Sequence, residues 1–132
     1  VSTFIYFIYL LGAEEREEEL RQTVGYCVRF DNCSPDPHGS ILYCTTGILL
    51  RRLQTDPELN NITHVIIDEV HERDLNTDFL LIIVKDLIQR KSKIKFILMS
   101  ATINARVFST YFNDCPIIEV SFLFLNYLFF QN

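Results

Sequence analysis

The sequence lacks several features that would point directly to a class of protein. Its histidines complete no zinc spacing, and its four cysteines form no CxxC pair. The cysteines are Cys27, Cys33, Cys44 and Cys115. Free thiols in a reducing compartment are therefore expected, in preference to a disulfide framework or a metal cluster. The formal net charge is −5, so no positive field over the whole molecule attracts nucleic acid. Any nucleic-acid contact must be built locally, from particular loops.

Long hydrophobic runs are also missing. Residues 1–11 and 120–130 are aromatic and apolar, but each is far shorter than the roughly twenty residues that cross a bilayer. The first run lacks the basic start and the cleavage site of a signal peptide. Neither run has the cationic face of a helix that lies on a membrane, so no membrane association is predicted. We interpret residues 1–12 and 121–132 as ends outside the domain, either edges of a fragment or sequence foreign to it.

What remains has an ordinary globular composition, with 48% hydrophobic and 22% charged residues. Short β-branched or apolar runs alternate with stretches of helical periodicity, which indicates a parallel sheet covered by helices on both faces. No repeat or low-complexity linker interrupts this pattern, so residues 13–120 are predicted to form one α/β domain. The predicted strands are 24–30, 41–44, 65–68, 96–99 and 117–120.

Helices are expected between these strands. Residues 13–21 are highly charged and are interpreted as a solvated helix face. Leu80, Leu81, Val84, Leu87 and Ile88 recur at helical spacing. Asn76 or Thr77 is the expected N-cap of that helix, and Asn104 is expected to cap a helix that ends at Tyr111.

Three predicted strands end in small polar or acidic residues. Thr45-Thr46-Gly47 follows the strand at 41–44, Asp68-Glu69 closes the strand at 65–68, and Ser100-Ala101-Thr102 follows the strand at 96–99. In open α/β sheets, ligands bind beyond the carboxyl ends of the strands. Three such ends in succession predict a site there.

The Asp68-Glu69 pair is costly unless it has a partner, because adjacent carboxylates at a buried strand repel each other and resist desolvation. A bound Mg²⁺ resolves the cost: Asp68 holds the metal, and Glu69 orients and deprotonates an attacking water. This is half of a nucleotide-hydrolysing site of the phosphate-loop type. An apolar run followed by Asp-Glu is a weak signal by itself, because many strands end in a solvated acidic turn.

Four motifs in order make the signal specific. Residues 68–73, DEVHER, resemble the DEAH box of superfamily 2 helicases, and Ser100-Ala101-Thr102 matches the SAT motif of that family. Thr45-Thr46-Gly47 matches its TxG motif, and VGYCVRFD at 24–31 is similar to the VGYxIRFE segment of the DEAH/RHA branch. Within that branch the sequence looks closest to RHA-like helicases that unwind G-quadruplexes and structured RNA. The quadruplex specificity of those relatives depends on an extension outside this chain, so it is not carried over.

The resemblance implies a partial RecA-like fold, ATP and Mg²⁺ as cofactors, RNA or DNA as partner, and a nuclear or cytoplasmic location. It implies that Asp68 holds Mg²⁺, that Glu69 is the general base, and that His71 links the nucleotide site to a second motor domain and to the nucleic acid. It also implies that Ser100, Ala101 and Thr102 couple hydrolysis to unwinding. Thr45, Thr46 and the Gly47 backbone would grip phosphates of the tracked strand.

The basic side chains near these motifs are ambiguous. Arg51 and Arg52 could assist that grip or be solvated helix residues. Arg29 and Arg73 are expected to pair with carboxylates rather than to act in catalysis.

One part of the family pattern is missing: none of the four glycines begins a GxxxxGK[ST] phosphate loop. In the family, that loop lies upstream of the region matched here, and the second motor domain lies downstream. The leading interpretation is a fragment of an ATP-dependent helicase that is inactive alone. An alternative is a non-catalytic module that binds RNA or a helicase partner. A third, a structural α/β domain with accidental motifs, is disfavoured by the four ordered matches.

Overall fold

A computed structural model describes residues 13–18, 22–37, 39–101, 105–120 and 125–130. Its internal contacts divide the chain into two compact units, Val1–Thr55 and Asp56–Asn132.

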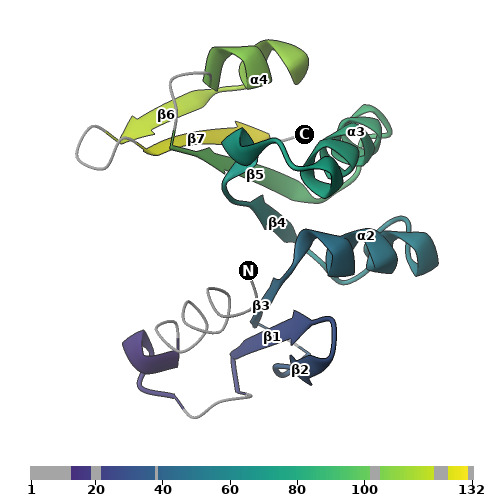
Figure 1. Ribbon diagram of the computed structural model, residues 1–132, viewed down its shortest axis with the longest axis vertical. Helices are drawn as coiled ribbons and strands as arrows, with labels where there is room; N and C mark the ends of the chain where they lie inside the picture. Colours follow the sequence, from purple (N-terminus) through teal and green to yellow (C-terminus); the bar gives the residue numbers. More distant parts are fainter. Residues whose placement is uncertain (1–12, 19–21, 38, 102–104, 121–124, 131–132) are drawn as a thin grey trace. The chain divides into compact units, whose positions relative to one another are not determined.

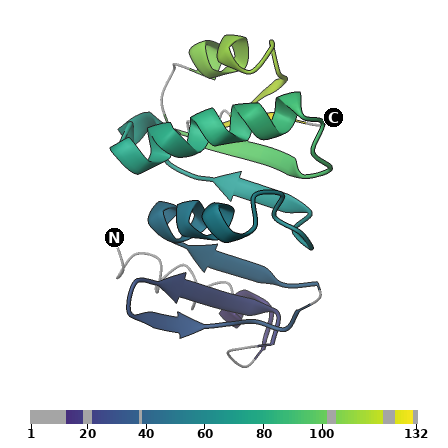
Figure 2. The same ribbon diagram turned by 90° about the vertical axis from the view of Figure 1, so that its right-hand side faces the viewer.

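The first unit contains a sheet of three strands in the order β2-β1-β3. Strand β1 (Val24–Val28) runs parallel to β3 (Ile41–Cys44) and antiparallel to β2 (Asp31–Cys33), and the three lie side by side in Figure 2. Helix α2 (Thr46–Thr55) begins two residues after β3 ends. This order places the Thr45-Thr46-Gly47 motif at the junction of a strand and a helix.

One face of β1 builds the small core of this unit. Val24 and Tyr26 are buried there with Ala13 and Cys33. The Tyr26 hydroxyl donates a hydrogen bond of 2.7 Å to Asp31 Oδ2, which ties the β1–β2 hairpin together. Gly25 permits the close approach of the following loop, because a Cβ there would lie 2.3 Å from Pro35 Cδ.

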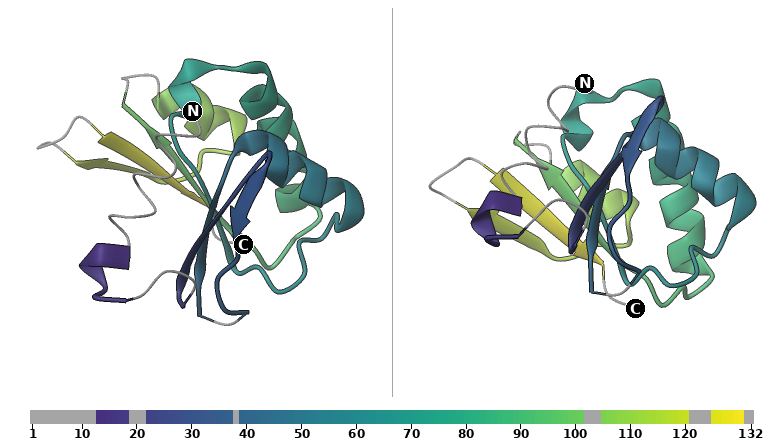
Figure 3. Two further views of the ribbon diagram at one scale, coloured as in Figure 1. Left: turned by 60° about the horizontal axis from the view of Figure 1, so that its bottom comes forward. Right: turned by 90° about the horizontal axis from the view of Figure 1, so that it is seen from below.

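The second unit contains a sheet of four strands in the order β4-β5-β7-β6. Strands β4 (His64–Ile67) and β5 (Lys95–Ser100) are parallel. Strand β7 (Leu125–Phe130) lies antiparallel between β5 and β6 (Ile117–Val120), as Figures 1 and 3 show. The helical elements are η1 (Val70–Glu72), α3 (Leu75–Gln89) and α4 (Ala105–Tyr111), and α4 packs against β6 and β7.

Alternating and helical apolar periodicities explain these elements. Along β5 the side chains of Phe96, Leu98 and Ser100 are buried, which is every second residue. Along α3 the buried positions follow the 3.6-residue period of a helix: Leu80, Leu81, Val84 and Leu87. The apolar face of each element therefore packs into the core of the unit, and β5 forms its centre.

The predicted α/β fold with parallel strands and flanking helices is confirmed, with corrections. Parallel pairing holds for β1–β3 and for β4–β5. Two strands that were not predicted, β2 and β7, run antiparallel to their neighbours. Strand β2 is only three polar or small residues long, so it left no β-pattern to detect. Strand β7 lies in the apolar end that we set outside the domain, and that boundary stays a prediction.

Two helix predictions also need correction. The charged stretch 13–21 is helical only at residues 13–15 within its described part, and residues 19–21 lie outside the described residues. Helix α3 is capped by Asp74, not by Asn76 or Thr77. Helix α4 ends at Tyr111 as expected, whereas its predicted cap, Asn104, lies outside the described residues. No helix among the described residues combines the length and apolar character of a membrane span.

Candidate functional site

Two parallel strands bring the acidic pair and the SAT motif to one edge of the second sheet. Ile67, the last residue of β4, is paired with Leu98 of β5. Asp68 and Ser100 therefore follow the same end of two hydrogen-bonded neighbours. Ser100 is fully buried and anchors the end of β5, while Asp68 is exposed. This is the carboxyl edge at which ligands bind in open α/β sheets.

The backbone after β4 reverses sharply at the acidic pair. Asp68 Oδ1 accepts a hydrogen bond of 2.8 Å from the Glu69 amide, which fixes the direction of the Asp68 carboxylate. Glu69 has φ 54° and ψ 36°, in the left-handed region. That conformation costs a non-glycine residue about 1–2 kcal/mol, so the surrounding structure must hold it in place.

A single 3₁₀ turn supports this reversal. Val70, the first residue of η1, is completely buried, and η1 packs against β5. Arg73, at the other end of the turn, is also left-handed, with φ 52°. Two strained residues thus bracket one turn that is pinned by a buried valine, and the geometry of Asp68 and Glu69 depends on that anchor.

His71 connects the two strand ends through one ring nitrogen. Its Nδ1 lies 3.3 Å from the Ala101 amide nitrogen and 3.2 Å from Glu69 Oε2. An unprotonated Nδ1 accepts the Ala101 N–H, whereas a protonated Nδ1 donates to the Glu69 carboxylate. The two roles exclude each other at a given moment. The ring is therefore hydrogen-bonded to Ala101 when Nδ1 carries no proton, and to Glu69 when Nδ1 carries one.

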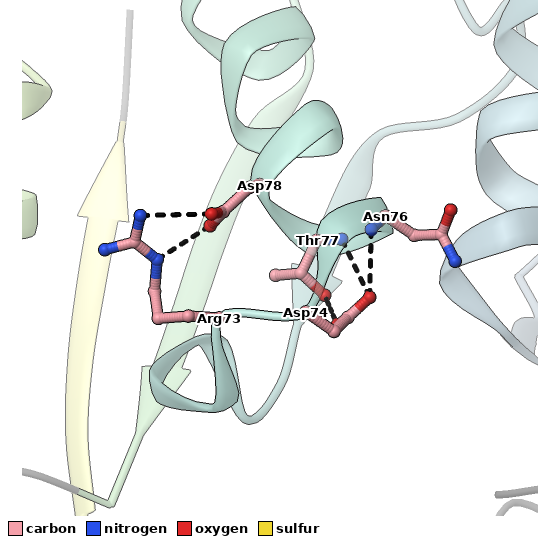
Figure 4. A network of polar contacts seen from close by, with 5 residues as sticks. All are labelled: Arg73, Asp74, Asn76, Thr77 and Asp78. Atoms are coloured by element: carbon pink, nitrogen blue, oxygen red, sulfur yellow. Dashed lines mark hydrogen bonds and ion pairs between the residues drawn. The ribbon is translucent and has the colours of Figure 1, made fainter.

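The segment after the DEVH residues is fixed by carboxylates, as Figure 4 shows. Arg73 donates two hydrogen bonds to Asp78, of 2.7 and 3.1 Å. Asp74 caps α3 by accepting from the Asn76 and Thr77 amides and from the Thr77 hydroxyl. The Thr77 hydroxyl bond lowers the pKa of Asp74, and the Arg73 bond lowers the pKa of Asp78. The expected carboxylate pairing of Arg73 is confirmed, whereas Arg29 instead lies 5.0 Å from the Phe30 ring centre.

We expect Asp74→Ala to lower the free energy of unfolding by about 1 kcal/mol at neutral pH, since it removes the cap of α3. The lowered pKa of Asp74 stabilises the fold above the unfolded value of roughly 4, and this contribution is lost as the pH falls below it. Urea unfolding of the chain at pH 7 and pH 3 measures both effects. Asp74→Asn should keep the cap and lose its pH dependence.

The matched control is Asp86→Ala on the same helix. The Asp86 side chain forms an exposed ion pair with Arg90, at 2.8 Å, so its loss should cost about 0.3–0.5 kcal/mol. Equal losses at Asp74 and Asp86 would contradict the cap.

The carboxylates that follow β4 fit a Mg²⁺ site in which most of the ligands come from the substrate and from water. Mg²⁺ in nucleotide sites uses one or two carboxylates and keeps several waters beside the substrate phosphates. Asp68 offers one exposed, oriented carboxylate, and no cluster of three His, Cys, Asp or Glu side chains exists among the described residues to form a protein cage. Asp68 is therefore the residue that would hold the ion.

The predicted nucleic-acid residues lie in the first unit. The Thr45 carbonyl accepts the amides of Ile48 and Leu49 in the first turn of α2, so Thr46 and Gly47 stand at a helix N-terminus. Space around Gly47 is open, because a Cβ there would meet nothing within 4 Å. The second unit brings together Asp68, Glu69, His71, Ser100 and Ala101, whereas Thr102 lies outside the described residues.

Sequence reasoning missed the Asp74 cap and the His71–Ala101 contact. The cap had a local signal, since Asp is a preferred N-cap residue and precedes Thr77 by three positions. The second contact joins residues thirty positions apart and depends on the β4–β5 register.

Comparison with models of known protein families identifies the family of the chain. The model of the DEAD/DEAH box helicase family matches residues 7–110. The chain belongs to the DEAD/DEAH box helicase family. The predicted family resemblance is thus confirmed.

The similar proteins are DExH-box helicases. The Arabidopsis thaliana DExH-box ATP-dependent RNA helicase DExH1 is 50% identical over 106 residues, covering 80% of this chain and 11% of that protein. The human ATP-dependent DNA/RNA helicase DHX36 is 49% identical over 110 residues, covering 82% of this chain and 11% of that protein. The human ATP-dependent RNA helicase DHX30 is 49% identical over 108 residues, covering 82% of this chain and 9% of that protein. The chain thus spans about a tenth of the length of these relatives.

Proposed function

We propose that this chain is the part of an ATP-dependent nucleic-acid helicase motor that carries the metal carboxylate, the water-activating base and the coupling contact. The observation that carries the proposal is the edge formed by β4 and β5. There Asp68 and Glu69 follow β4, and His71 Nδ1 lies 3.3 Å from the amide of the residue after β5. Acidic and coupling motifs on adjacent parallel strands are what nucleotide hydrolysis linked to movement requires.

Each residue has a distinct role in the proposal. Asp68 holds Mg²⁺, which when bound neutralises charge on the nucleotide phosphates. Glu69 accepts a proton from the attacking water. Because Glu69 lies 3.2 Å from His71 Nδ1, a change in the charge of the carboxylate alters the bond that His71 makes. The Ser100-Ala101-Thr102 segment, bonded to His71 through Ala101, then carries that change along β5.

The nucleic-acid partner is proposed to be RNA or DNA, held at the start of α2. A helix N-terminus presents amides and positive dipole to a phosphate, and the Thr45 and Thr46 hydroxyls add neutral donors. This fits a net charge of −5, since the grip needs no positive surface. We also propose a nuclear or cytoplasmic location, which fits four cysteines that form no disulfide among the described residues.

The chain on its own is proposed to be catalytically silent. It contains no GxxxxGK[ST] sequence, so it has no loop to cradle the β- and γ-phosphates. The same absence favours the second candidate, a module that binds RNA or a helicase partner without turnover.

The proposed function can be tested in a chimaera of human DHX36 in which the matched part of this chain, 82% of its length, replaces the corresponding residues of DHX36. Thr45→Val should weaken RNA binding about tenfold, because one hydrogen bond to a charged phosphate is worth roughly 1.5 kcal/mol. The loss should be equal for all RNA sequences and leave the salt dependence unchanged, since no charge is removed. Fluorescence anisotropy with short single strands measures it.

Two controls accompany this variant. Thr45→Ser keeps the hydroxyl and should bind like the parent chimaera. Thr55→Val removes a hydroxyl that only donates to the Arg52 carbonyl, at 3.0 Å, at the far end of α2. Unchanged RNA binding by Thr45→Val, or equal loss in Thr55→Val, would contradict a phosphate contact at the TxG motif.

A further inference from the structure

Two free cysteines of the first unit face each other across neighbouring strands. Cys27 of β1 is the register partner of Cys44 of β3 in a parallel pair. Neighbouring strands lie about 4.8 Å apart, which is inside the Cα separation of roughly 4.4–6.8 Å that a disulfide spans. Both side chains project to the same face of the sheet, because register partners share a face.

That face is separate from the one that holds the small core. Side chains alternate along a strand, so Cys27 projects opposite to Tyr26. Tyr26 lies in the buried cluster with Cys33, its register partner on β2. Cys33 is therefore close to Cys27 in sequence but projects from the other face. The fold, rather than chain proximity, selects Cys44 as the partner of Cys27.

Cys27 also borders an open groove of about 430 Å³ within the first unit. The basic side chains of Arg29, Arg51 and Arg52 line the groove with Asn32 and Thr55, and no acidic side chain does so. A small solute that carries carboxylates would therefore meet Cys27 in a basic setting. Cys44 does not line the groove, and burial above all raises the pKa of its thiol to about 11.

We propose that Cys27 and Cys44 form a reversible disulfide by exchange with a small disulfide that carries carboxylates, of which glutathione disulfide is the type. In the first step the Cys27 thiol loses its proton to solvent, its sulfur bonds to one glutathione sulfur, and the glutathione S–S bond breaks to release a glutathione thiolate, which takes up a proton. In the second step the Cys44 thiol loses its proton to solvent, its sulfur bonds to Cys27 Sγ, and the second glutathione leaves as a thiolate that takes up a proton. Two protein thiols are oxidised, and one glutathione disulfide is reduced to two thiols.

The order in which the two cysteines react follows from which of them borders the groove. Cys27 is half-buried and borders the groove, so it reacts first, whereas Cys44 does not line the groove and reacts second with its register partner Cys27. The cross-link would join β1 to the last residue of β3, directly before Thr45. The proposal does not depend on nucleotide hydrolysis or on nucleic-acid binding by the chain.

The experiment uses the full 132-residue chain, incubated with glutathione disulfide, alkylated, and digested with trypsin without reduction. Cys27 lies in the tryptic peptide 22–29, and Cys33 and Cys44 both lie in 30–51. We expect these two peptides to be linked. The link should persist in Cys33→Ala and vanish in Cys44→Ala, in which Cys27 should instead retain one glutathione.

The same reaction in urea tests whether the fold, and not closeness in sequence, selects Cys44 as the partner of Cys27. In urea the shorter loop between Cys27 and Cys33 closes more easily, so the Cys27–Cys44 preference should be lost. The basic groove is tested with cystamine, a cationic disulfide, which should react at Cys27 about tenfold more slowly than glutathione disulfide. A link that needs Cys33, a link equally strong in urea, or stable glutathione on Cys27 of the parent chain would overturn the proposal.

Discussion

Replacing Glu69 by Gln in the DHX36 chimaera is expected to reduce ATP turnover by about 10²–10⁴-fold, the usual contribution of a general base. The amide keeps the size of the side chain and can still meet His71, but it cannot accept a proton from water. The left-handed backbone at Glu69 is unaffected, so the turn should keep its shape. Steady-state phosphate release with saturating RNA and Mg²⁺ measures the loss.

The control for Glu69→Gln is Glu72→Gln, one turn further along η1. Glu72 is exposed and follows His71, so it lies in the same charged segment without reaching His71 Nδ1 in the described contacts. Its turnover should stay close to that of the parent chimaera. If both variants lost activity equally, local charge rather than a base at Glu69 would explain the effect.

The second large effect concerns the 132-residue chain alone, which we expect to release no phosphate from ATP above background. Hydrolysis in this architecture depends on holding the phosphates and on meeting the developing charge. An arginine finger alone contributes about 10³–10⁵ in rate, and a missing phosphate loop also removes most nucleotide affinity. The chain supplies Asp68, Glu69 and the His71 contact, none of which replaces those groups.

The comparison is made with the parent chimaera at equal concentration, with and without RNA. RNA-stimulated release by the chain, abolished by Glu69→Gln, would show that it is a working enzyme. If neither the chain nor the chimaera released phosphate, the result would instead argue against the proposed function of the segment.

Periodicity predicted the parts of the fold that packing dictates. Strands β4 and β5 were found within one residue of their ends because their apolar runs are short, β-branched and closed by polar residues. Strand β7 was not predicted, because its run of Leu, Tyr and Phe is as compatible with an apolar end as with a strand. Only pairing with β5 and β6 distinguishes the two, and pairing is a long-range property.

The candidate site also has a part that the sequence predicted and a part that it did not. The identities of Asp68, Glu69 and Ser100 could be inferred because they follow predicted strands in a family pattern. The 3.3 Å approach of His71 to Ala101 could not, since it results from the β4–β5 register and from the left-handed turn at Glu69. Left-handed Glu and Arg residues have no propensity signal, because such strain persists only where the surrounding structure holds it, here around the buried Val70 of a turn that packs on β5.

In the proposed function the two adjacent carboxylates have different tasks: Asp68 holds the metal and Glu69 accepts a proton from the water. The most direct measurement is equilibrium binding of a fluorescent ATP analogue to the Asp68→Asn and Glu69→Gln chimaeras across a Mg²⁺ titration. We predict that Glu69→Gln binds like the parent chimaera at every Mg²⁺ concentration, whereas Asp68→Asn loses the Mg²⁺-dependent part of the affinity. Equal loss in both variants, or a loss confined to Glu69→Gln, would contradict this assignment.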